Sequence, residues 1–578
     1  MSEETGADWR RDARGGASWF VQRVRALLPK AADYRAMRVA PQRDLIAGIT
    51  VGVVALPLAL AFGITSGLGA AAGLITAIVA GIVAAVFGGS NVQISGPTGA
   101  MTVVLVPIVA EYGANGVLVV GMIAGLLLVI MAFAGLGRYV RFIPLPVIEG
   151  FTLGIAVIIA LQQVPAALGL TGSGEQVVIV AVRAVAEWLA APQWIPVLIA
   201  AGVAGAMVVA ARLRIKPAVP VALIAVVVAT VVVQVAHLDM ATIGTLPSSL
   251  PAPTLPAFTF ADLRILIAPA IAVAALAALE SLLSATVADA MSVSQRHDPD
   301  RELFGQGLAN VASPLFGGIP ATAAIARTAV NVRTGAVSRL SAIVHSLVLL
   351  GVVLALGSVV GLIPLAALAG VLIATALRMV EVSSLRALLH SGRSDTLVLV
   401  ITFVATVALD LATAVILGIV AAGAIALRQV ARSATLTETP LPQADGSDSH
   451  TAEERALLDE HIIAFRFEGP LFFGGAHSAL LELAEVSDIR VVILRLAHLT
   501  TLDATGAAVL SDTIRGLEAR GITVLVSGLP EQFEPRLQAT GMLEHLEAQH
   551  HVFEHTPDAI GHARRHVARD GHHAGDTK

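Results

Sequence analysis

The chain has 578 residues, of which 56% are hydrophobic and only 14% charged. Such a sequence is too apolar for a large soluble protein and indicates an integral membrane protein. It contains no cysteine, which excludes disulfides, thiolate metal sites and cysteine nucleophiles. The formal net charge of −5 is small, and no segment offers the basic face that nucleic-acid binding needs.

Residues 1–43 are polar and rich in arginine, and we interpret them as a cytoplasmic N-terminal region. They lack the apolar core and cleavage site of a signal peptide. Within them, Trp19–Leu28 is expected to be either an interfacial amphipathic helix or part of a disordered basic arm.

Residues 44–432 are almost wholly hydrophobic and are predicted to form a transmembrane domain. Segments of about 20 residues fit the hydrocarbon thickness, whereas a segment of about 13 residues cannot cross alone. The first seven predicted segments lie near 44–66, 70–88, 98–110, 116–135, 144–168, 195–211 and 219–238. The second seven lie near 264–292, 302–316, 321–333, 337–358, 364–380, 395–410 and 412–431. Residues 176–191 are predicted to form a helix on the membrane surface.

The two sets of seven segments have the features of a repeat. IPLPVIEG at 143–150 matches IPLAALAG at 363–370, and Pro97 and Pro320 have nearly the same offset. Seven is an odd number, so the second copy must enter the membrane upside down, which predicts a 7+7 inverted repeat. Basic residues gather in alternate connections, and the positive-inside rule then places both termini in the cytoplasm.

The third segment of each set is short and follows a stretch broken by Gly and Pro. Such a pair of broken segments points to the binding site of a secondary transporter. The inverted copies should bring two helix N-termini, expected at about Thr98 and Ala321, together near the midplane. Free N–H groups and helix dipoles favour an anion there. The predicted substrate-binding residues are Ser95, Gly96, Thr98, Gly99, Thr322, Ala323 and Arg327, and Thr102 is expected to add a hydroxyl.

Arg327 and Glu280 are ionisable residues in apolar segments, where a charge is a functional hypothesis by default. Arg327 is expected about two turns into its helix. One hypothesis is that it provides positive potential for an anion. The alternative is a structural pairing with an acidic residue or with backbone carbonyls. Glu280 lies in a low-dielectric region that suits a reversible proton carrier. Ser284 lies one turn on, on the same face. Glu280 and Ser284 are therefore predicted to serve coupling, and a plain salt bridge to Arg327 is the alternative.

These residues resemble the sulfate permease family of anion transporters. The resemblance is carried by QISGPT at 93–98, ESLL at 280–283 and the stretch 317–331 with Arg327, which looks like bacterial members that carry four-carbon dicarboxylates. It implies a core domain that holds the substrate, a gate domain, elevator-like movement, and a homodimer in the bacterial plasma membrane. Sodium-dependent bicarbonate members usually have Asp at the position of Glu280, which favours coupling to protons or no coupling here.

The composition changes after Arg432. Residues 433–458 are polar and are predicted to be a linker. Residues 459–560 are predicted to form a small α/β unit that resembles the cytoplasmic STAS domain of the family. Its expected strands are 461–467, 491–496 and 523–527, and its expected helices are 475–486, 504–519 and 531–541. Asp503 is expected to cap the helix that follows it, and capping is favoured over phosphorylation of Thr505.

Residues 561–578 are predicted to be a disordered tail. Eight histidines lie between His545 and His573, but their irregular spacing predicts no metal site. No cofactor is expected, and no P-loop or catalytic triad predicts an enzyme.

The predicted function is secondary active transport of a small anion: sulfate, bicarbonate, or a four-carbon dicarboxylate such as fumarate or succinate. Proton coupling is expected, and the alternative is an uncoupled exchanger or channel on the same fold. A nucleobase permease is disfavoured by Arg327 and the STAS-like unit. A receptor is disfavoured by the intact pair of broken segments.

Overall fold

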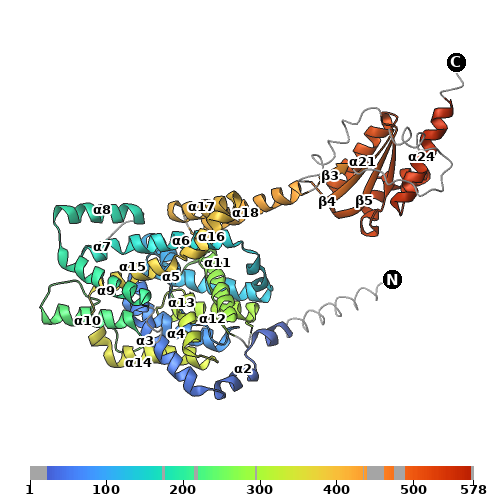
Figure 1. The fold of residues 1–578 in the computed structure, drawn as a ribbon. Coiled ribbons are helices and arrows are strands. Elements are labelled where there is room, and N and C mark those ends of the chain that lie inside the picture. Colours follow the sequence, from blue (N-terminus) through green and yellow to red (C-terminus); the bar gives the residue numbers. More distant parts are fainter. Residues whose placement is uncertain are drawn as a thin grey trace. The chain divides into compact units, whose positions relative to one another are not determined.

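A computed structural model describes residues 22–171, 176–213, 219–292, 296–409, 411–433, 435–438, 461–473 and 489–573. The chain divides into two compact units, Met1–Ile419 and Val420–Lys578. The first unit is helical and the second contains a sheet (Figure 1). The boundary falls inside helix α18 (Leu411–Arg432).

Each predicted membrane segment has a helical counterpart in the first unit or in α18. The first set comprises α3 (Pro41–Thr65), α4 (Ala70–Phe87), α5 (Gly99–Phe133), α6 (Leu145–Gln162) with α7 (Val164–Ala167), α9 (Trp194–Arg212) and α10 (Val221–Val235). The second comprises α11 (Phe260–Met291), α12 (Pro299–Leu315), α13 (Ile325–Thr334), α14 (Leu340–Val360), α15 (Leu365–Met379), α17 (Arg393–Ala408) and α18. Helix α5 holds two predicted segments, separated at Gly113, where φ is +68°. Among the described residues, nine helices are long and apolar enough to cross a membrane.

Shorter elements complete the first unit. The predicted surface helix is confirmed as a helix by α8 (Val177–Ala190), whose apolar residues Val182 and Leu189 are exposed. Helix α16 (Val382–Ser391) was not predicted from the sequence. The 3₁₀ turn η2 (Leu136–Phe142) follows α5, and α2 (Ala31–Arg35) and η1 (Ala36–Arg38) precede α3.

The described part of the N-terminal region is not a free basic arm. Residues 22–27 are helical, and Leu27 is buried. Arg23 forms an ion pair with Asp300 at 2.8 Å, and Arg301 pairs with Asp33 at 2.7 Å. The alternative of a disordered arm is therefore wrong for these residues, because their charges pair with the start of α12.

The helices of the first unit pack as two groups. One group contains α3, α4, α5 and α11 to α14, and the other contains α6, α9, α10, α15 and α17. The contact between α3 and α14 has its counterpart in that between α11 and α5. Likewise α6 packs on α17 as α15 packs on α9. Exchanging the two sets of segments thus converts these contacts into one another, as expected of a repeat.

The second unit is a five-stranded sheet with helices on both faces. The strand order is β3 (Thr435–Glu438), β4 (Ile462–Leu471), β5 (Val491–Leu502), β6 (Thr523–Ser527), β7 (Val552–Phe553). Strand β3 is antiparallel to β4, and the other pairs are parallel. Residues of α21 (Ala504–Ala519), η3 (Glu531–Phe533), α22 (Glu534–Gln538) and α23 (Met542–Ala548) pack on one face, and α24 (Thr556–His573) covers the other. Strands alternate their side chains between the two faces, which explains the two cores.

The structure confirms the strands predicted at 461–467, 491–496 and 523–527, and the N-cap. Asp503 Oδ1 accepts a hydrogen bond from Gly506 N at 2.6 Å. Two expectations are corrected. Strand β3 lies in the predicted linker, where Leu436 joins the sheet's core. The predicted tail is helical to His573, because Ala563 and Val567 of α24 are buried against the sheet. The predicted helix at 475–486 and residues 574–578 lie outside the described residues.

Candidate anion-binding site

Two short strands bring the broken segments together. Strand β1 (Ser95–Gly96) pairs antiparallel with β2 (Thr322–Ala323), with Ser95 opposite Ala323 and Gly96 opposite Thr322. Immediately after β1, Thr98 caps α5, its hydroxyl accepting from Met101 N at 3.4 Å. Immediately after β2, α13 begins at Ile325. Two helix N-termini therefore meet at the paired strands β1 and β2, as the sequence predicted. We call this place the crossing.

The start of the second helix was predicted too early. The expected start at about Ala321 is wrong, because residues 321–323 are extended and bonded to other segments. Arg327 is accordingly the third residue of α13, in its first turn, rather than about two turns in. This brings its side chain closer to the crossing than expected.

Glu280 joins hydroxyls from both halves of the chain. Its Oε2 accepts hydrogen bonds from Thr98 Oγ1 at 2.8 Å and from Thr322 Oγ1 at 2.5 Å. The two hydroxyl oxygens lie 3.1 Å apart, and both threonines are buried. A carboxyl from α11 is thus held at the point where the two inverted copies meet.

Arg327 contacts the chain at the end of β1. Its Nη2 donates to Pro97 O at 2.7 Å, and its side chain is buried. Among the described residues Nη1 has no hydrogen-bond partner, and no ion pair joins Arg327 to Glu280. A Cβ at Gly96 would lie 2.7 Å from Nη1, so only glycine allows this approach. The predicted alternative of a plain salt bridge between Glu280 and Arg327 is therefore wrong. The other alternative for Arg327, pairing with a backbone carbonyl, is present at Pro97.

Several other predicted residues serve the frame of the site. The hydroxyl of Ser284 donates to Thr328 Oγ1 at 3.2 Å rather than to Glu280. Thr102 Oγ1 donates to Gly99 O at 2.7 Å, inside its own helix. A Cβ at Gly99 would lie 2.3 Å from Ile159 Cδ1, so α6 approaches this glycine closely.

Sequence reasoning did not assign roles to Ser281 or Gln93. Ser281 Oγ accepts from Ala323 N at 3.2 Å, which fixes β2 on α11. Gln93 Nε2 donates to Ser281 O at 2.9 Å, which fixes the segment before β1. Both residues lie inside the stretches that carry the family resemblance, so a signal was present, but their partners are distant in sequence.

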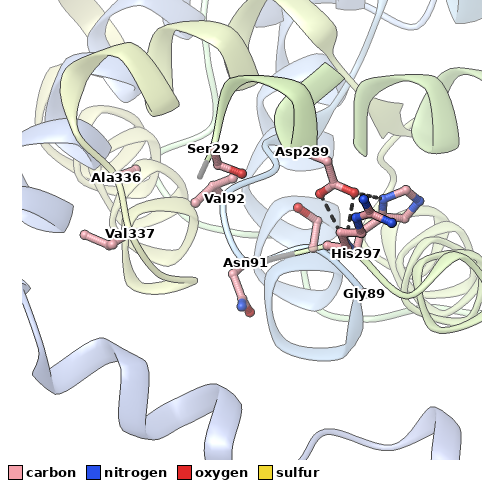
Figure 2. A pocket seen from close by; sticks show the side chains of 10 residues that line it. Gly89, Asn91, Val92, Asp289, Ser292, His297, Ala336 and Val337 are labelled. Carbon is pink, nitrogen blue, oxygen red and sulfur yellow. Dashed lines mark hydrogen bonds and ion pairs between the residues drawn. The ribbon is translucent and has the colours of Figure 1, made fainter. Parts of the chain in front are cut away.

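A separate pocket lies at the end of α11 (Figure 2). Asp289 Oδ2 and His297 Nδ1 lie 2.7 Å apart there, and His297 N donates to both carboxylate oxygens. The pocket is lined by the chain before β1, at Asn91 and Val92, and after α13, at Ala336 and Val337. None of its lining residues belongs to the cluster around Glu280.

Comparisons with known proteins identify the family of the chain. The sequence matches the model of the sulfate permease family at residues 42–402 and that of the STAS domain at residues 456–559. It is 37% identical to the putative sulfate transporter YvdB of Bacillus subtilis (strain 168), over 90% of this chain and 97% of that protein. It is 32% identical to the bicarbonate transporter BicA of Synechocystis, over 86% of this chain and 90% of that protein.

Solved structures show the same fold. The transmembrane domain of a cyanobacterial bicarbonate transporter BicA matches with a TM-score of 0.61 and 34% identity, over 65% of this chain and 98% of that chain. The murine anion transporter Slc26a9 matches with a TM-score of 0.79 over 94% of both chains, at 17% identity. These relatives are transporters rather than enzymes. The chain therefore belongs to the sulfate permease family, as a helical membrane transporter with a C-terminal STAS domain.

Proposed function

We propose that this protein is a secondary active transporter that carries a small oxyanion together with a proton. Sulfate is the first candidate and bicarbonate the second, because relatives named for these anions match most of the chain. A four-carbon dicarboxylate is a third candidate. The observation that carries the proposal is the Glu280 carboxyl, bonded to hydroxyls from both halves between two helix N-termini.

The crossing offers several groups that favour a negative charge. Each helix N-terminus carries roughly half a positive elementary charge. Thr98 and Thr322 provide two hydroxyls, and Arg327 provides a guanidinium whose Nη1 has no partner among the described residues. An anion bound here accepts from backbone, hydroxyl and guanidinium donors at once.

Glu280 provides the coupling in this proposal. When it is ionised, both hydroxyls donate to it and its charge opposes the anion. At a separation of about 4 Å, two like charges near a protein surface repel by roughly 4 kcal/mol. A protonated carboxyl removes that repulsion and lets both hydroxyls donate to the anion. Proton and anion therefore each favour binding of the other.

The movement in this proposal is that of one helix group against the other. The site residues on α5, α11 and α13 all belong to the group that also contains α3, α4, α12 and α14. An elevator-like shift of this group past α6, α9, α10, α15 and α17 would expose the crossing alternately to the two sides. We further propose a homodimer in the bacterial plasma membrane, with both termini cytoplasmic.

The test is uptake of radiolabelled sulfate, bicarbonate, fumarate and succinate into proteoliposomes, with and without a pH gradient. Uptake of the true substrate should rise as the external pH falls. Glu280→Gln mimics the protonated state, so it should still bind the anion but lose accumulation driven by the gradient. Because no ion pair joins Glu280 to Arg327, its stability cost should stay below the roughly 3–5 kcal/mol of a broken buried pair.

Glu149→Gln is the matched control, since Glu149 is a carboxyl of a membrane helix that bonds Ser384 instead of the crossing. A stable Glu280→Gln protein that still concentrates anion in response to a proton gradient would exclude Glu280 as the carrier. Uptake that does not depend on the pH gradient but requires a counter-anion inside the vesicles would favour the uncoupled exchanger.

A further inference from the structure

Helix α12 carries a row of buried polar side chains in an apolar environment. Glu302, Gln306, Asn310 and Ser313 are each at most 2% exposed. Spacings of three and four residues place them on one face of the helix. Buried polar groups are retained where hydrogen bonds satisfy them, so their partners show what the row does.

The first part of the row holds the segment that leads into β1. Glu302 Oε2 accepts from Gly89 N at 2.8 Å and from Ser90 N at 3.1 Å. Gln306 Nε2 donates to Ser95 Oγ at 2.6 Å and to Glu302 Oε1 at 3.0 Å. These contacts fix the backbone of the first half on α12.

The second part of the row holds the segment that leads into β2. Asn310 Oδ1 accepts from Ala321 N at 2.9 Å, and its Nδ2 donates to Ala321 O at 2.8 Å. The side-chain amide thus pairs with Ala321 as a neighbouring strand would. Ser313 Oγ donates to Ile319 O at 2.9 Å. One helix therefore holds both segments that form the crossing.

We infer that this face of α12 sets the separation of the two helix N-termini, and that Asn310 is a positioning residue for anion affinity. Asn310 acts through Ala321 on the next residue, Thr322, whose hydroxyl bonds Glu280. Asparagine suits the position because its amide offers both a donor and an acceptor, whereas aspartate lacks the donor. The inference rests on the proposed function, in which the crossing binds an oxyanion.

The test uses Asn310→Asp in the full chain, with sulfate and bicarbonate as probes. The change keeps the shape but places an oxygen against Ala321 O. The KM of the transported anion should rise about tenfold while kcat changes less than about twofold. Thr375→Val is the matched control, because the Thr375 hydroxyl donates within α15 to Val371 O, its one hydrogen-bond partner among the described residues.

A double-mutant cycle separates positioning from general structural damage. Thr322→Val removes the hydroxyl through which Asn310 acts, so Asn310→Asp should raise KM much less in that background. An additive cycle, an unchanged KM, or equal losses in kcat/KM and kcat would overturn the inference. If Asn310→Asp does not fold, Gln306→Met tests the β1 part of the row by the same change in KM.

The outcome also distinguishes the two proposals. A wild-type protein that transports none of sulfate, bicarbonate, fumarate and succinate refutes the proposed function and the inference with it. A wild-type protein that transports one of them, with an Asn310→Asp variant of unchanged KM, refutes only the role of α12.

Discussion

Arg327 and Glu280 reach the crossing from different helices, and their hydrogen bonds separate their roles. Glu280 contacts two hydroxyls, which can donate to a carboxylate or, once it is protonated, to another acceptor. Arg327 contacts a backbone carbonyl, which holds its guanidinium in place without neutralising it. In the proposed function the arginine therefore supplies a fixed charge, and the carboxyl is the group that changes its charge.

Arg327→Ala is expected to weaken sulfate binding by roughly tenfold to a hundredfold, the value of a hydrogen bond to a charged group. The fold should survive, because the change removes a buried cation that forms no ion pair with a carboxylate among the described residues. Isothermal titration with sulfate and thermal unfolding, measured on the same sample, check both points. Arg333→Ala is the control, since Arg333 lies two turns on in α13 and is exposed. Wild-type affinity in Arg327→Ala would place the anion elsewhere.

At the scale of elements, glycines let α3 and α4 approach closely. A Cβ at Gly73 of α4 would lie 2.0 Å from Ala59 O and 2.8 Å from Gly63 Cα, both on α3. Helices in membranes associate through such small residues, because lipid provides little hydrophobic drive between them. Both helices belong to the group that carries the site.

Gly73→Ala should therefore destabilise the first unit by about 1–3 kcal/mol, the usual cost of overpacking. The backbone atoms of α3 cannot move aside as a flexible side chain would. Gly202→Ala in α9 is the matched control, because a Cβ there meets nothing within 4 Å. That change should be neutral or stabilise by about 0.4–1 kcal/mol. Thermal unfolding in detergent measures the difference, and equal melting temperatures would contradict the close approach.

The elements that follow local rules were predictable from the sequence. Runs of about 20 apolar residues predicted the membrane helices, and breaks at Gly and Pro predicted that the two broken segments meet. The start of α13 was not predictable, because residues 321–323 are held by β1 and Asn310 rather than by local preference. Helix α24 was not predicted, because its many histidines suggested a disordered tail. Its buried residues Ala559, Ala563 and Val567 nevertheless lie at helical spacing.

The candidate site was predictable only where charge or chain breaks mark it. Glu280 and Arg327 stand out as charges in apolar segments, and the structure places both at the crossing. The partner of Ser284, Thr328, was not predictable, because the position of Ser284 on a helix face does not show which segment lies opposite. Asn310 is visible as an amide in a predicted membrane segment, but its partner Ala321 depends on how the chain turns between them.

At the scale of the whole molecule, the second unit contains a histidine, His551, whose protonation should affect the stability of that unit. Val526 N of β6 donates to His551 O at 2.9 Å, and the His551 ring contacts that of His562 on α24 at 5.7 Å. Burial lowers the pKa of His551 to about 4, helped by the nearby histidines His562, His566, His545 and His550. The folded unit thus favours the neutral imidazole at this position.

The sign of the pH dependence follows from this lowered pKa. An unfolded chain binds a proton at His551 near the ordinary value of about 6.5, whereas the folded unit resists it down to about 4. The stability contributed by the neutral imidazole is therefore complete above about pH 6.5 and is lost progressively as the pH falls toward 4. The two units have separate internal contacts, so acid should affect the second without unfolding the first.

Amide hydrogen exchange of the full chain at about pH 7.5 and about pH 5, corrected for intrinsic rates, tests this prediction. Peptides from β6 and α24 should lose protection at the lower pH, while peptides from α4 and α12 keep theirs. His551→Asn removes the titrating group and should flatten the pH dependence in β6 and α24. His555→Asn is the matched control: the His555 side chain is exposed, and His555 is not among the histidines that lower the pKa of His551. A pH dependence that survives His551→Asn would assign the acid sensitivity to another group, and a loss of protection shared by α4 would contradict the independence of the two units.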